Sequence, residues 1–516
     1  MDKKKYVDFM DELNPSELYE GLLGYGLFVD KLPPVFDAVP FFNYCNETRL
    51  EVSPNVTGGF ISYWVTRNIG VPRLMGIPNP FLYHNLCREL EKNWDDIRNY
   101  FREKTKNQKH IVSRIHIRKI KDTNRLFEMN YSNWKTDGNP ELDLLMLEKG
   151  PSRFVVHADI STCFPSIYTH SIPWAAVGKK EAKVNKRDDI WYNKIDKACS
   201  NLCEGETHGL LIGPHASNLV SEIVLTAVDS ELCEEYRYIR NIDDYECFVK
   251  SREEGERFLR DLEEKLRQFD LYVNHKKTKF IELPINTEKN WKHQLSDLPK
   301  IGKHGVIEFP QVNSFIDVAL TLSKETGDYA VFNYAIKKLK GMDVSRNGKE
   351  LAGRRIMHIA TLNPYLLNLM EEYVFTPYGV KEIEIEKFAN AIYEDSVQRH
   401  DYESTSFAIY FAIKYGLKIQ AFEDDYAKAQ QTVIDSKDCI FLTMTWLYFI
   451  RKNHWNRTAS QLKLLNKEAR TLAQTDMDRY WLFCYEALSY GSLKGEWRAL
   501  KECGISFIKN EFRNEP

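Results

Sequence analysis

The sequence YIRNIDDYECFV, residues 238–249, places two adjacent aspartates, Asp243 and Asp244, between two apolar runs. Asparagine and aspartate favour tight turns, so an isolated pair of this kind is typical of a β-hairpin turn. Two carboxylates held together at a strand end also suit a divalent cation, because such ions as magnesium prefer oxygen ligands. A third carboxylate elsewhere in the chain is needed to choose between the two interpretations.

That third carboxylate lies 84 residues earlier. The sequence RFVVHADISTCFPSIY, residues 153–168, predicts a strand that ends at Asp159, with Phe164 five positions further on. Between the two acidic strands, HGLLIGPHASNLVSEIVLTAVD predicts a Gly-Pro loop, which contains Gly213, leading into a helix. Downstream, LYVNHKKTKF places Lys277 where a turn ends and another strand begins.

This ordered series of four signatures resembles the palm of reverse transcriptases, and the resemblance favours a catalytic role for the aspartates. It extends to the defence-associated reverse transcriptases of bacteria and prophages, the abortive-infection group. Those proteins commonly carry a Gly-Pro loop like LLIGPHASNLVSEI, where retroviral and group II intron enzymes have a Pro-Gln-Gly loop. Asn241 and Ile242 depart from the group, because a tyrosine-containing pair usually precedes the aspartates.

The resemblance implies a two-metal-ion site, with Mg²⁺ as the expected cofactor and Mn²⁺ as an alternative. Asp159 and Asp243 would contact both ions, Asp244 would support the ion on the attacking side, and the backbone carbonyl of Ile160 would complete the metal site. Phe164 would lie under the sugar and exclude a 2′-hydroxyl. The alternative role of Phe164 is packing in the core.

Nucleotide-binding residues are expected from the fingers and from the loops around the palm. Residues 101–125 carry nine Lys or Arg against two acids, and IVSRIHIRKI within them predicts a strand with projecting basic residues. Arg114, Arg118 and Arg125 fit a role in contacting the triphosphate through forked donors. Gly213 and Lys277 complete the set, and a solvated hairpin lysine is the alternative for Lys277. Upstream, Arg67 and Arg73 resemble the group's first fingers block.

Composition excludes several classes of protein. The chain has 516 residues, of which 43% are apolar and 28% charged, as in globular proteins, and its formal net charge is −3. It contains no run of 18 apolar residues and no signal-peptide pattern at its start, so a cytoplasmic protein without membrane contact is expected. Cys199, Cys203 and His208 could supply zinc ligands, but their spacing is unusual for such a site.

The expected fold class is α+β. Residues 1–300 mix strands and helices, and the resemblance implies that they form reverse-transcriptase fingers and palm. From residue 313 to 516 the pattern changes to short amphipathic helices, which predicts an all-α, solenoid-like (HEAT-like) domain; a compact helical bundle is the alternative.

The resulting functional prediction is a DNA polymerase of reverse-transcriptase type in antiphage defence. Its Gly-Pro loop lacks the glutamine that lies near the template in retroviral enzymes, which favours template-independent synthesis. The resemblance implies protein priming, because the group includes members that extend DNA without a template from a protein hydroxyl. The alternatives are a polymerase that copies a dedicated noncoding RNA and an inactive palm on a helical scaffold. Expected partners are deoxynucleoside triphosphates, a DNA product that could be covalently attached, a noncoding RNA in the first alternative, and further copies of the chain.

Overall fold

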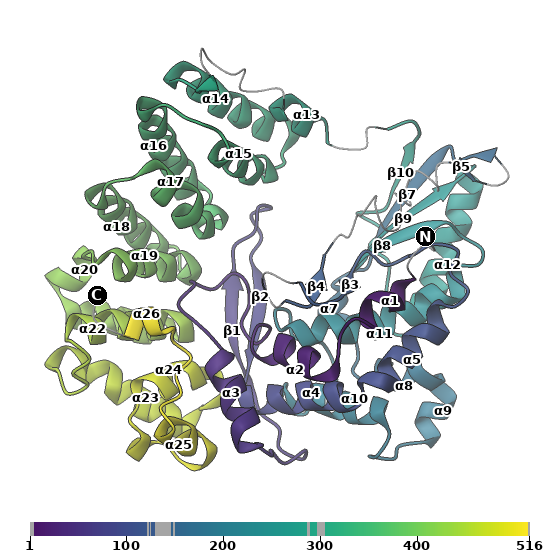
Figure 1. Cartoon of the computed structure of the whole chain (residues 1–516), viewed down its shortest axis with the longest axis horizontal. Helices are drawn as coiled ribbons and strands as arrows, with labels where there is room; N and C mark the ends of the chain where they lie inside the picture. Colours follow the sequence, from purple (N-terminus) through teal and green to yellow (C-terminus); the bar gives the residue numbers. More distant parts are fainter. Residues whose placement is uncertain are drawn as a thin grey trace. The chain divides into compact units, whose positions relative to one another are not determined.

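The computed structural model describes residues 5–120, 123, 125–129, 146–147, 150–285, 289–296 and 305–513 (Figure 1). Contacts between residues divide the chain into two compact units. The sheet unit comprises Met1–Val29, Asp37–Ile61 and Gly76–Ile285. The helical unit comprises Asp30–Phe36, Ser62–Met75 and Asn286–Pro516. The predicted domain bounds, 1–300 and 313–516, stay a prediction.

A four-stranded antiparallel sheet forms the centre of the sheet unit. Its strand order is β10–β7–β9–β8. The strands are β7 (Phe154–Asp159), β8 (Tyr238–Asn241), β9 (Asp244–Val249) and β10 (Lys279–Glu282). All four were predicted from their β-branched and aromatic residues, and the structure confirms each of them.

Helices pack around this sheet. The helices of the sheet unit are α1 (Tyr6–Met10), α2 (Pro15–Leu23), α3 (Val39–Thr48), α4 (Pro80–Lys92), α5 (Trp94–Thr105), α7 (Cys163–Ser166), α8 (Ser171–Val177), α9 (Lys179–Val184), α10 (Trp191–Asn201), α11 (His215–Leu232) and α12 (Arg252–Arg267). Helix α12 lies against β7 and β9, and a Cβ at Gly255 would stand 2.7 Å from Val156 Cγ2. A larger residue there would push α12 off the sheet. Helix α11 is buried almost throughout, as expected for a helix that is apolar on most of its surface.

Three two-stranded ribbons accompany the main sheet. They pair β1 (Phe60–Val65) with β2 (Arg73–Pro78), β3 (His116–Ile117) with β4 (Phe127–Glu128), and β5 (Met146–Leu147) with β6 (Gly150–Pro151). The prediction of a basic strand over residues 111–120 was wrong in extent, because only His116 and Ile117 are strand. Residues 112–117 are buried rather than projecting, since this segment pairs with the backbone of β8.

The helical unit contains no strand from residue 305 to 513, the range that the structure describes there, apart from isolated bridges. Its helices are α13 (Asn290–Ser296), α14 (Phe309–Thr326), α15 (Ala330–Lys340), α16 (Arg346–Leu362), η2 (Pro364–Leu369), η3 (Glu371–Phe375), α17 (Thr376–Tyr378), α18 (Glu382–Gln398), α19 (Tyr402–Tyr415), α20 (Gln420–Asp424), α21 (Tyr426–Ser436), α22 (Cys439–Lys452), η4 (Ser460–Leu462), α23 (Lys463–Thr475), η5 (Asp478–Tyr480), α24 (Trp481–Ala487), η6 (Tyr490–Ser492), α25 (Gly495–Glu502) and α26 (Asn510–Arg513).

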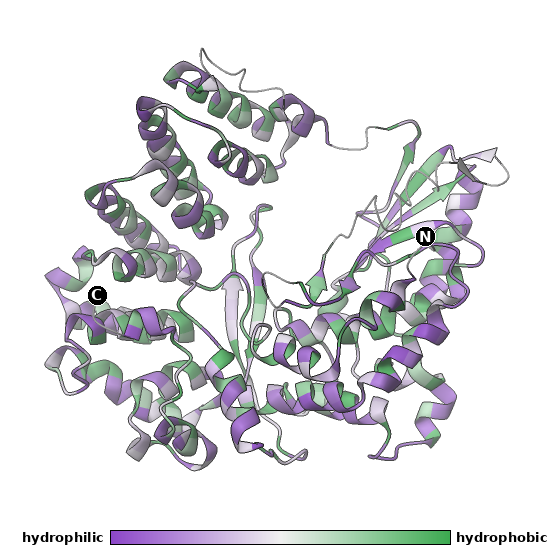
Figure 2. Cartoon of the chain, in the orientation of Figure 1, coloured by the Kyte–Doolittle hydropathy of each residue, from purple (hydrophilic) through white to green (hydrophobic). Residues whose placement is uncertain are grey.

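These helices form one continuous packing series. Helix α18 packs on α19, α19 on α22, and α22 on α24. The outer helix α23 alternates hydrophobic and hydrophilic residues, whereas α19 and α22 are mostly hydrophobic and buried (Figure 2). The all-helical prediction is confirmed for the described part, and the solenoid-like arrangement stays a prediction. Residues 364–375, within the region predicted as short amphipathic helices, form a 3₁₀ segment, η2, and a π-helical turn, η3.

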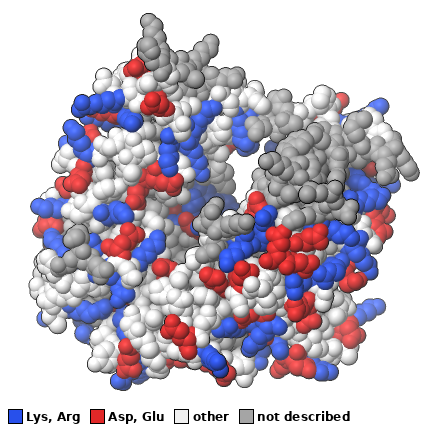
Figure 3. Space-filling model, viewed as in Figure 1, with Lys and Arg blue, Asp and Glu red and all other residues white. Residues whose placement is uncertain are grey.

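Charges of both signs are interspersed on the face shown in Figure 3. This agrees with the small formal net charge of −3. Among the described residues, none of the helices combines the length and the apolar character that crossing a membrane requires.

Candidate active site

The three aspartates converge at one end of the main sheet. Asp159 ends β7 and Asp244 begins β9, and the two are directly paired in the antiparallel register. Asp243 lies in the two-residue turn between β8 and β9. The backbone N–H of Ile160 donates to the carbonyl of Asp243 at 3.0 Å, which ties this turn to the end of β7. Aspartates 84 positions apart thus lie at one end of the sheet, and their assignment to one catalytic site stays a prediction.

Lys277 lies at the same place. Its Nζ donates to Asp159 Oδ2 at 2.7 Å, although 64% of its side chain is exposed. The backbone guides it there, because the N–H of Asn274 donates to the Asp159 carbonyl at 2.7 Å and that of Lys277 to the Asn274 carbonyl at 3.0 Å. The hydrogen bond to Asp159 raises the pKa of the Lys277 ammonium, so this lysine is charged at neutral pH.

Crowded carboxylates give the site a distinct electrostatic character. Partial burial, followed by the charges of Asp243 and Asp159, raises the pKa of Asp244 to about 6, against a smaller opposing effect of Lys277. Like charges held close together disfavour the ionised form, and a bound cation relieves that repulsion. This arrangement is therefore suited to attract cations.

The oxygen donors fit a divalent ion, but they do not form a finished metal site. Asp159 is buried, Asp243 is half-buried and Asp244 is exposed, so the carboxylates are reached from one side. In the described part of the chain, no group of three or more His, Cys, Asp or Glu side chains is arranged to hold a metal ion. Neither the three aspartates nor Cys199, Cys203 and His208 form such a group. The Lys277 ammonium would have to share Asp159 Oδ2 with a bound cation, or leave it.

A buried ionic network lies behind the aspartate turn and was not predicted. Arg240 on β8 pairs with Glu222 at 2.7 Å and with Asp229 at 2.8 Å, and all three side chains are 0–2% exposed. A signal was present in the sequence, because Glu222 and Asp229 are seven residues apart and fall on one face of a largely buried helix. Two acids on one face of such a helix indicate a buried cationic partner.

The region that contains the aspartates matches a known protein family. Residues 81–301 match the family described as reverse transcriptase (RNA-dependent DNA polymerase), and this range contains all three aspartates and Lys277. This region is reverse-transcriptase-like. The match supports an enzyme, a nucleotidyltransferase that resembles RNA-directed DNA polymerases. Polymerases of this family generally use divalent metal ions. No curated protein matches the sequence.

Solved structures similar to the chain include yeast telomerases. Apo telomerase from Candida tropicalis is 13% identical, with 83% of this chain and 72% of that chain covered and a TM-score of 0.34. The form truncated from the C-terminal domain is 15% identical, with 48% and 55% covered and a TM-score of 0.31. Telomerase from Candida albicans with a fragment of telomeric RNA is 11% identical, with 84% and 66% covered and a TM-score of 0.31. The chain thus spans 55% of the truncated telomerase, and we base no argument on these likenesses.

Phe164, one of the predicted nucleotide-binding residues, is linked through its backbone to the Gly-Pro loop that contains Gly213. Phe164 is on the short helix α7 directly after β7, and its carbonyl accepts from the N–H of Leu210 at 2.8 Å. This bond joins α7 to the Gly-Pro loop. Phe164 is half-buried, so both its predicted contact with the sugar and the core-packing alternative remain open.

Gly213 has a structural requirement of its own. Its φ of +128° is rarely adopted by other residues, and a Cβ there would lie 2.1 Å from Val29 Cγ1. The glycine thus allows the loop to pass close to Val29 just before α11 begins. A contact of Gly213 with nucleotide stays a prediction.

The predicted fingers arginines have different environments. Arg114 is only 4% exposed, and its N–H donates to the Arg240 carbonyl at 2.7 Å. Arg118 is partly exposed beside Glu128, at 3.6 Å, and lies over the Phe9 ring. Arg125 is exposed at the end of the connection to β4. Arg118 and Arg125 therefore present cationic groups at the surface, whereas Arg114 is part of the interior.

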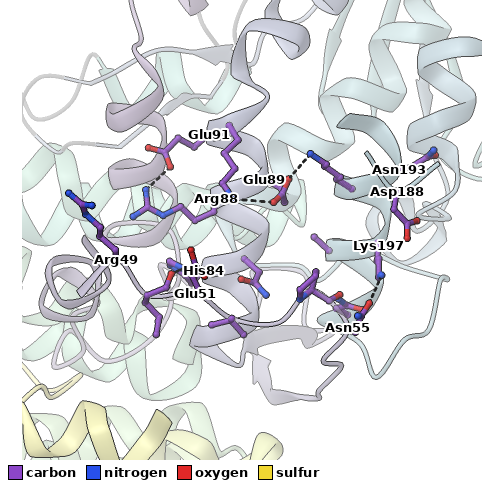
Figure 4. Close-up of a pocket in the computed structure, with 18 residues that line it drawn as sticks. Arg49, Glu51, Asn55, His84, Arg88, Glu89, Glu91, Asp188, Asn193 and Lys197 are labelled. Atoms are coloured by element: carbon purple, nitrogen blue, oxygen red, sulfur yellow. Dashed lines mark hydrogen bonds and ion pairs between the residues drawn. The ribbon is translucent and has the colours of Figure 1, made fainter. Parts of the chain in front are cut away.

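A separate cavity of about 670 Å³ lies in the sheet unit (Figure 4). It is lined by the residues after α3 and by parts of α4 and α10. Its charged side chains pair with one another, as Arg88 does with Glu91 at 2.7 Å and Lys194 with Glu89 at 4.0 Å. None of the predicted site residues lines it, so this cavity is distinct from the aspartate site.

Proposed function

We propose that this protein is a DNA polymerase of reverse-transcriptase type that adds deoxynucleotides through Asp159, Asp243 and Asp244. The observation that carries the proposal is the direct pairing of Asp159 with Asp244 at the sheet end, with Asp243 in the adjacent turn. Carboxylates from two strands at one sheet end provide the oxygen ligands that a phosphoryl-transfer site requires.

In this reaction a hydroxyl oxygen forms a bond to the α-phosphorus of the nucleotide, and pyrophosphate leaves. Asp159, Asp243, Asp244 and the Ile160 carbonyl would hold Mg²⁺, or Mn²⁺ in its place. Such ions lower the pKa of the attacking hydroxyl and neutralise charge on the phosphates. Lys277, whose ammonium is held beside Asp159, is positioned to donate a proton to the leaving pyrophosphate. Phe164 would exclude ribose, and Arg118 and Arg125 would contact the triphosphate.

The finer part of the proposal concerns priming, template and biological role. We infer template-independent synthesis primed by a protein hydroxyl, with a cytoplasmic role in antiphage defence. The Gly-Pro loop in place of a Pro-Gln-Gly loop, and an all-helical region after the palm, support this assignment. Both features resemble the abortive-infection group, whose members often assemble into homo-oligomers.

The test is an incorporation assay without added nucleic acid. Purified full-length protein would be incubated with Mg²⁺ or Mn²⁺ and each labelled deoxynucleotide in turn, and products separated on denaturing gels. Label that stays with the protein, and is released by nuclease but not by denaturant, is expected. Asp159→Ala serves as the inactive control.

Two other results would change the proposal. Incorporation that requires an added or copurified RNA, and that is lost after ribonuclease treatment, would replace template independence with copying of a noncoding RNA. Equal incorporation by wild type and Asp159→Ala would reject the assignment of the site.

A further inference from the structure

Arg240 lies three residues before Asp243, and its side chain is completely buried, with 0% exposed. The guanidinium donates to both oxygens of Glu222, at 2.7 and 3.1 Å, and its Nε donates to Asp229 Oδ2 at 2.8 Å. A buried charge is tolerated only when it is paired and hydrogen-bonded. Two carboxylates on one helix therefore hold the guanidinium in a single orientation.

The carboxylates are themselves held by further donors. Glu222 Oε2 accepts from the hydroxyl of Tyr6 at 3.0 Å and from that of Ser113 at 2.9 Å. Asp229 Oδ1 accepts from the hydroxyl of Tyr238 at 3.0 Å. Each of these partners is buried, so the network cannot exchange its bonds for water without opening the core.

One N–H of the Arg240 guanidinium donates to the aspartate turn, while others donate to Glu222 and Asp229. Nη1 also donates to the carbonyl of Ile242 at 3.0 Å. Ile242 has a φ of +56°, which a β-branched residue rarely adopts. Such a conformation persists only where its surroundings impose it. The Ile242 carbonyl is held by Arg240, and the next carbonyl, that of Asp243, is held by the N–H of Ile160.

We propose that Arg240 is a positioning residue for the polymerase reaction, because its guanidinium fixes the Ile242 carbonyl and so sets the position of the Asp243 carboxylate. The inference rests on the proposed function. Ligands for a two-metal site must be held to a fraction of an ångström, so a loosened turn is expected to slow the chemical step. The Arg240 side chain is 0% exposed, so it would act through the turn rather than by direct contact with substrate.

The test compares Arg240→Lys with Tyr238→Phe. The lysine keeps a buried cation but cannot reach Glu222, Asp229 and Ile242 together. The phenylalanine removes a hydrogen bond from Asp229 at the far end of the same network and leaves the Ile242 contact intact. We expect Arg240→Lys to lower kcat about 10- to 100-fold with KM for the nucleotide changed less than about twofold. Tyr238→Phe should lower the melting temperature and keep kcat within about twofold of wild type.

Amide hydrogen exchange on metal-free protein provides a readout that needs no activity. Exchange at residues 241–244 should be faster in Arg240→Lys and unchanged in Tyr238→Phe. If wild type incorporates no nucleotide, the proposed function fails, while the exchange result still decides whether Arg240 holds the turn. Unchanged exchange and kcat in Arg240→Lys, or an equal loss of kcat in Tyr238→Phe, would overturn the inference. If Arg240→Lys does not fold, Glu222→Gln takes its place, because it removes a charge that orients Arg240. It is judged by kcat and by amide exchange at residues 241–244, with the same expected and contradicting outcomes.

Discussion

The charges around the aspartate turn divide into a buried set and an accessible set. Arg240 is enclosed with two buried carboxylates and meets the aspartate turn through a hydrogen bond to the Ile242 carbonyl. Lys277 is 64% exposed and touches Asp159 from the solvent side. Only the lysine end of this ion pair is exposed, because the side chain of Asp159 is 8% exposed. Removing Arg240 would leave two buried acids without their partner.

The double change Asp243→Ala, Asp244→Ala should abolish incorporation while the protein stays folded. The change removes the oxygen ligands and also relieves like-charge repulsion, so the free energy of unfolding should be unchanged or slightly higher, by less than about 1 kcal/mol. Incorporation assays and thermal melting measure the two effects. The matched control is Asp188→Ala, Asp189→Ala, another adjacent acidic pair, which should remain fully active. Retained incorporation in the first variant would contradict the assignment.

Phe164→Ala should allow ribonucleotides to be incorporated. The proposed role of the half-buried Phe164 ring is to fill the space that a 2′-hydroxyl would occupy, so removing the ring should remove the exclusion. We expect the ratio of kcat/KM for deoxynucleotide over ribonucleotide to fall about tenfold or more. Phe42→Ala, which removes a half-buried ring from α3, is the control and should leave the ratio unchanged. An unchanged ratio in Phe164→Ala would return this residue to a packing role.

At the scale of elements, regular patterns were predictable and close contacts were not. The strand ending at Asp159 and the helix from His215 have strong periodicity, and both form where expected. The segment 111–120 alternates basic and apolar residues, but its backbone pairs with β8 and its Arg114 is buried. Alternation identifies two faces of a segment, and it does not identify which face another element covers. The Arg240 network left a signal in the two acids of α11, Glu222 and Asp229, but the sequence did not identify Arg240 as their partner.

Gly213→Ala should destabilise the protein by about 2–4 kcal/mol, because the added Cβ meets Val29 in a backbone conformation unfavourable for alanine. Gly150→Ala is a matched control, since Gly150 has a similar φ of +117° and no atom of the described residues lies within 4 Å of the added Cβ. The control should lose only about 1 kcal/mol. Chemical denaturation measures both, and equal losses would show that the approach to Val29 is not what requires the glycine.

Glu403 on α19 should make stability depend on pH. Burial raises its pKa from 4.5 to about 7, although the N–H of Thr66 donates to its carboxylate. A raised carboxyl pKa means that the folded state binds the proton more tightly than the unfolded state does. Stability therefore falls as pH rises from about 4.5 to about 7, by up to about 3 kcal/mol for the shift cited here.

Glu403→Gln keeps an acceptor for Thr66 and removes the titration. The melting temperature of this variant relative to wild type should rise between about pH 4.5 and pH 7 and level off above that range. Glu382→Gln, at an exposed position on α18, is the control and should show no such trend. A difference between Glu403→Gln and wild type that does not change with pH would contradict the expectation.

At the scale of the whole molecule, the two compact units are interleaved along the chain. Residues 30–36 and 62–75 belong to the helical unit although they come from the first 75 residues. The N–H of Lys509 donates to the Val35 carbonyl at 2.9 Å, and Phe36 forms a β-bridge with Ile508. A composition change near residue 300 was visible in the sequence. Pairings across more than 400 positions carry no local signal, so these contacts were beyond prediction.

A fragment of residues 1–285 should therefore aggregate and lack incorporation activity, even though it contains every predicted site residue. Without residues 286–516, the fragment exposes Val35, Phe36 and Tyr63, which are all at most 8% exposed in the intact chain. Apolar surface of this kind drives association when it loses its cover. Size-exclusion chromatography and the incorporation assay measure the two outcomes.

Coexpression as two separate chains, 1–285 and 286–516, is the matched control. The pieces should copurify, because residues 30–36 and 62–75 can still pack into the helical unit, and incorporation should return at least in part. This result would assign the second half a role in completing the fold instead of supplying catalytic groups. A soluble, monomeric and fully active fragment of residues 1–285 would show that the helical unit is dispensable for the polymerase reaction.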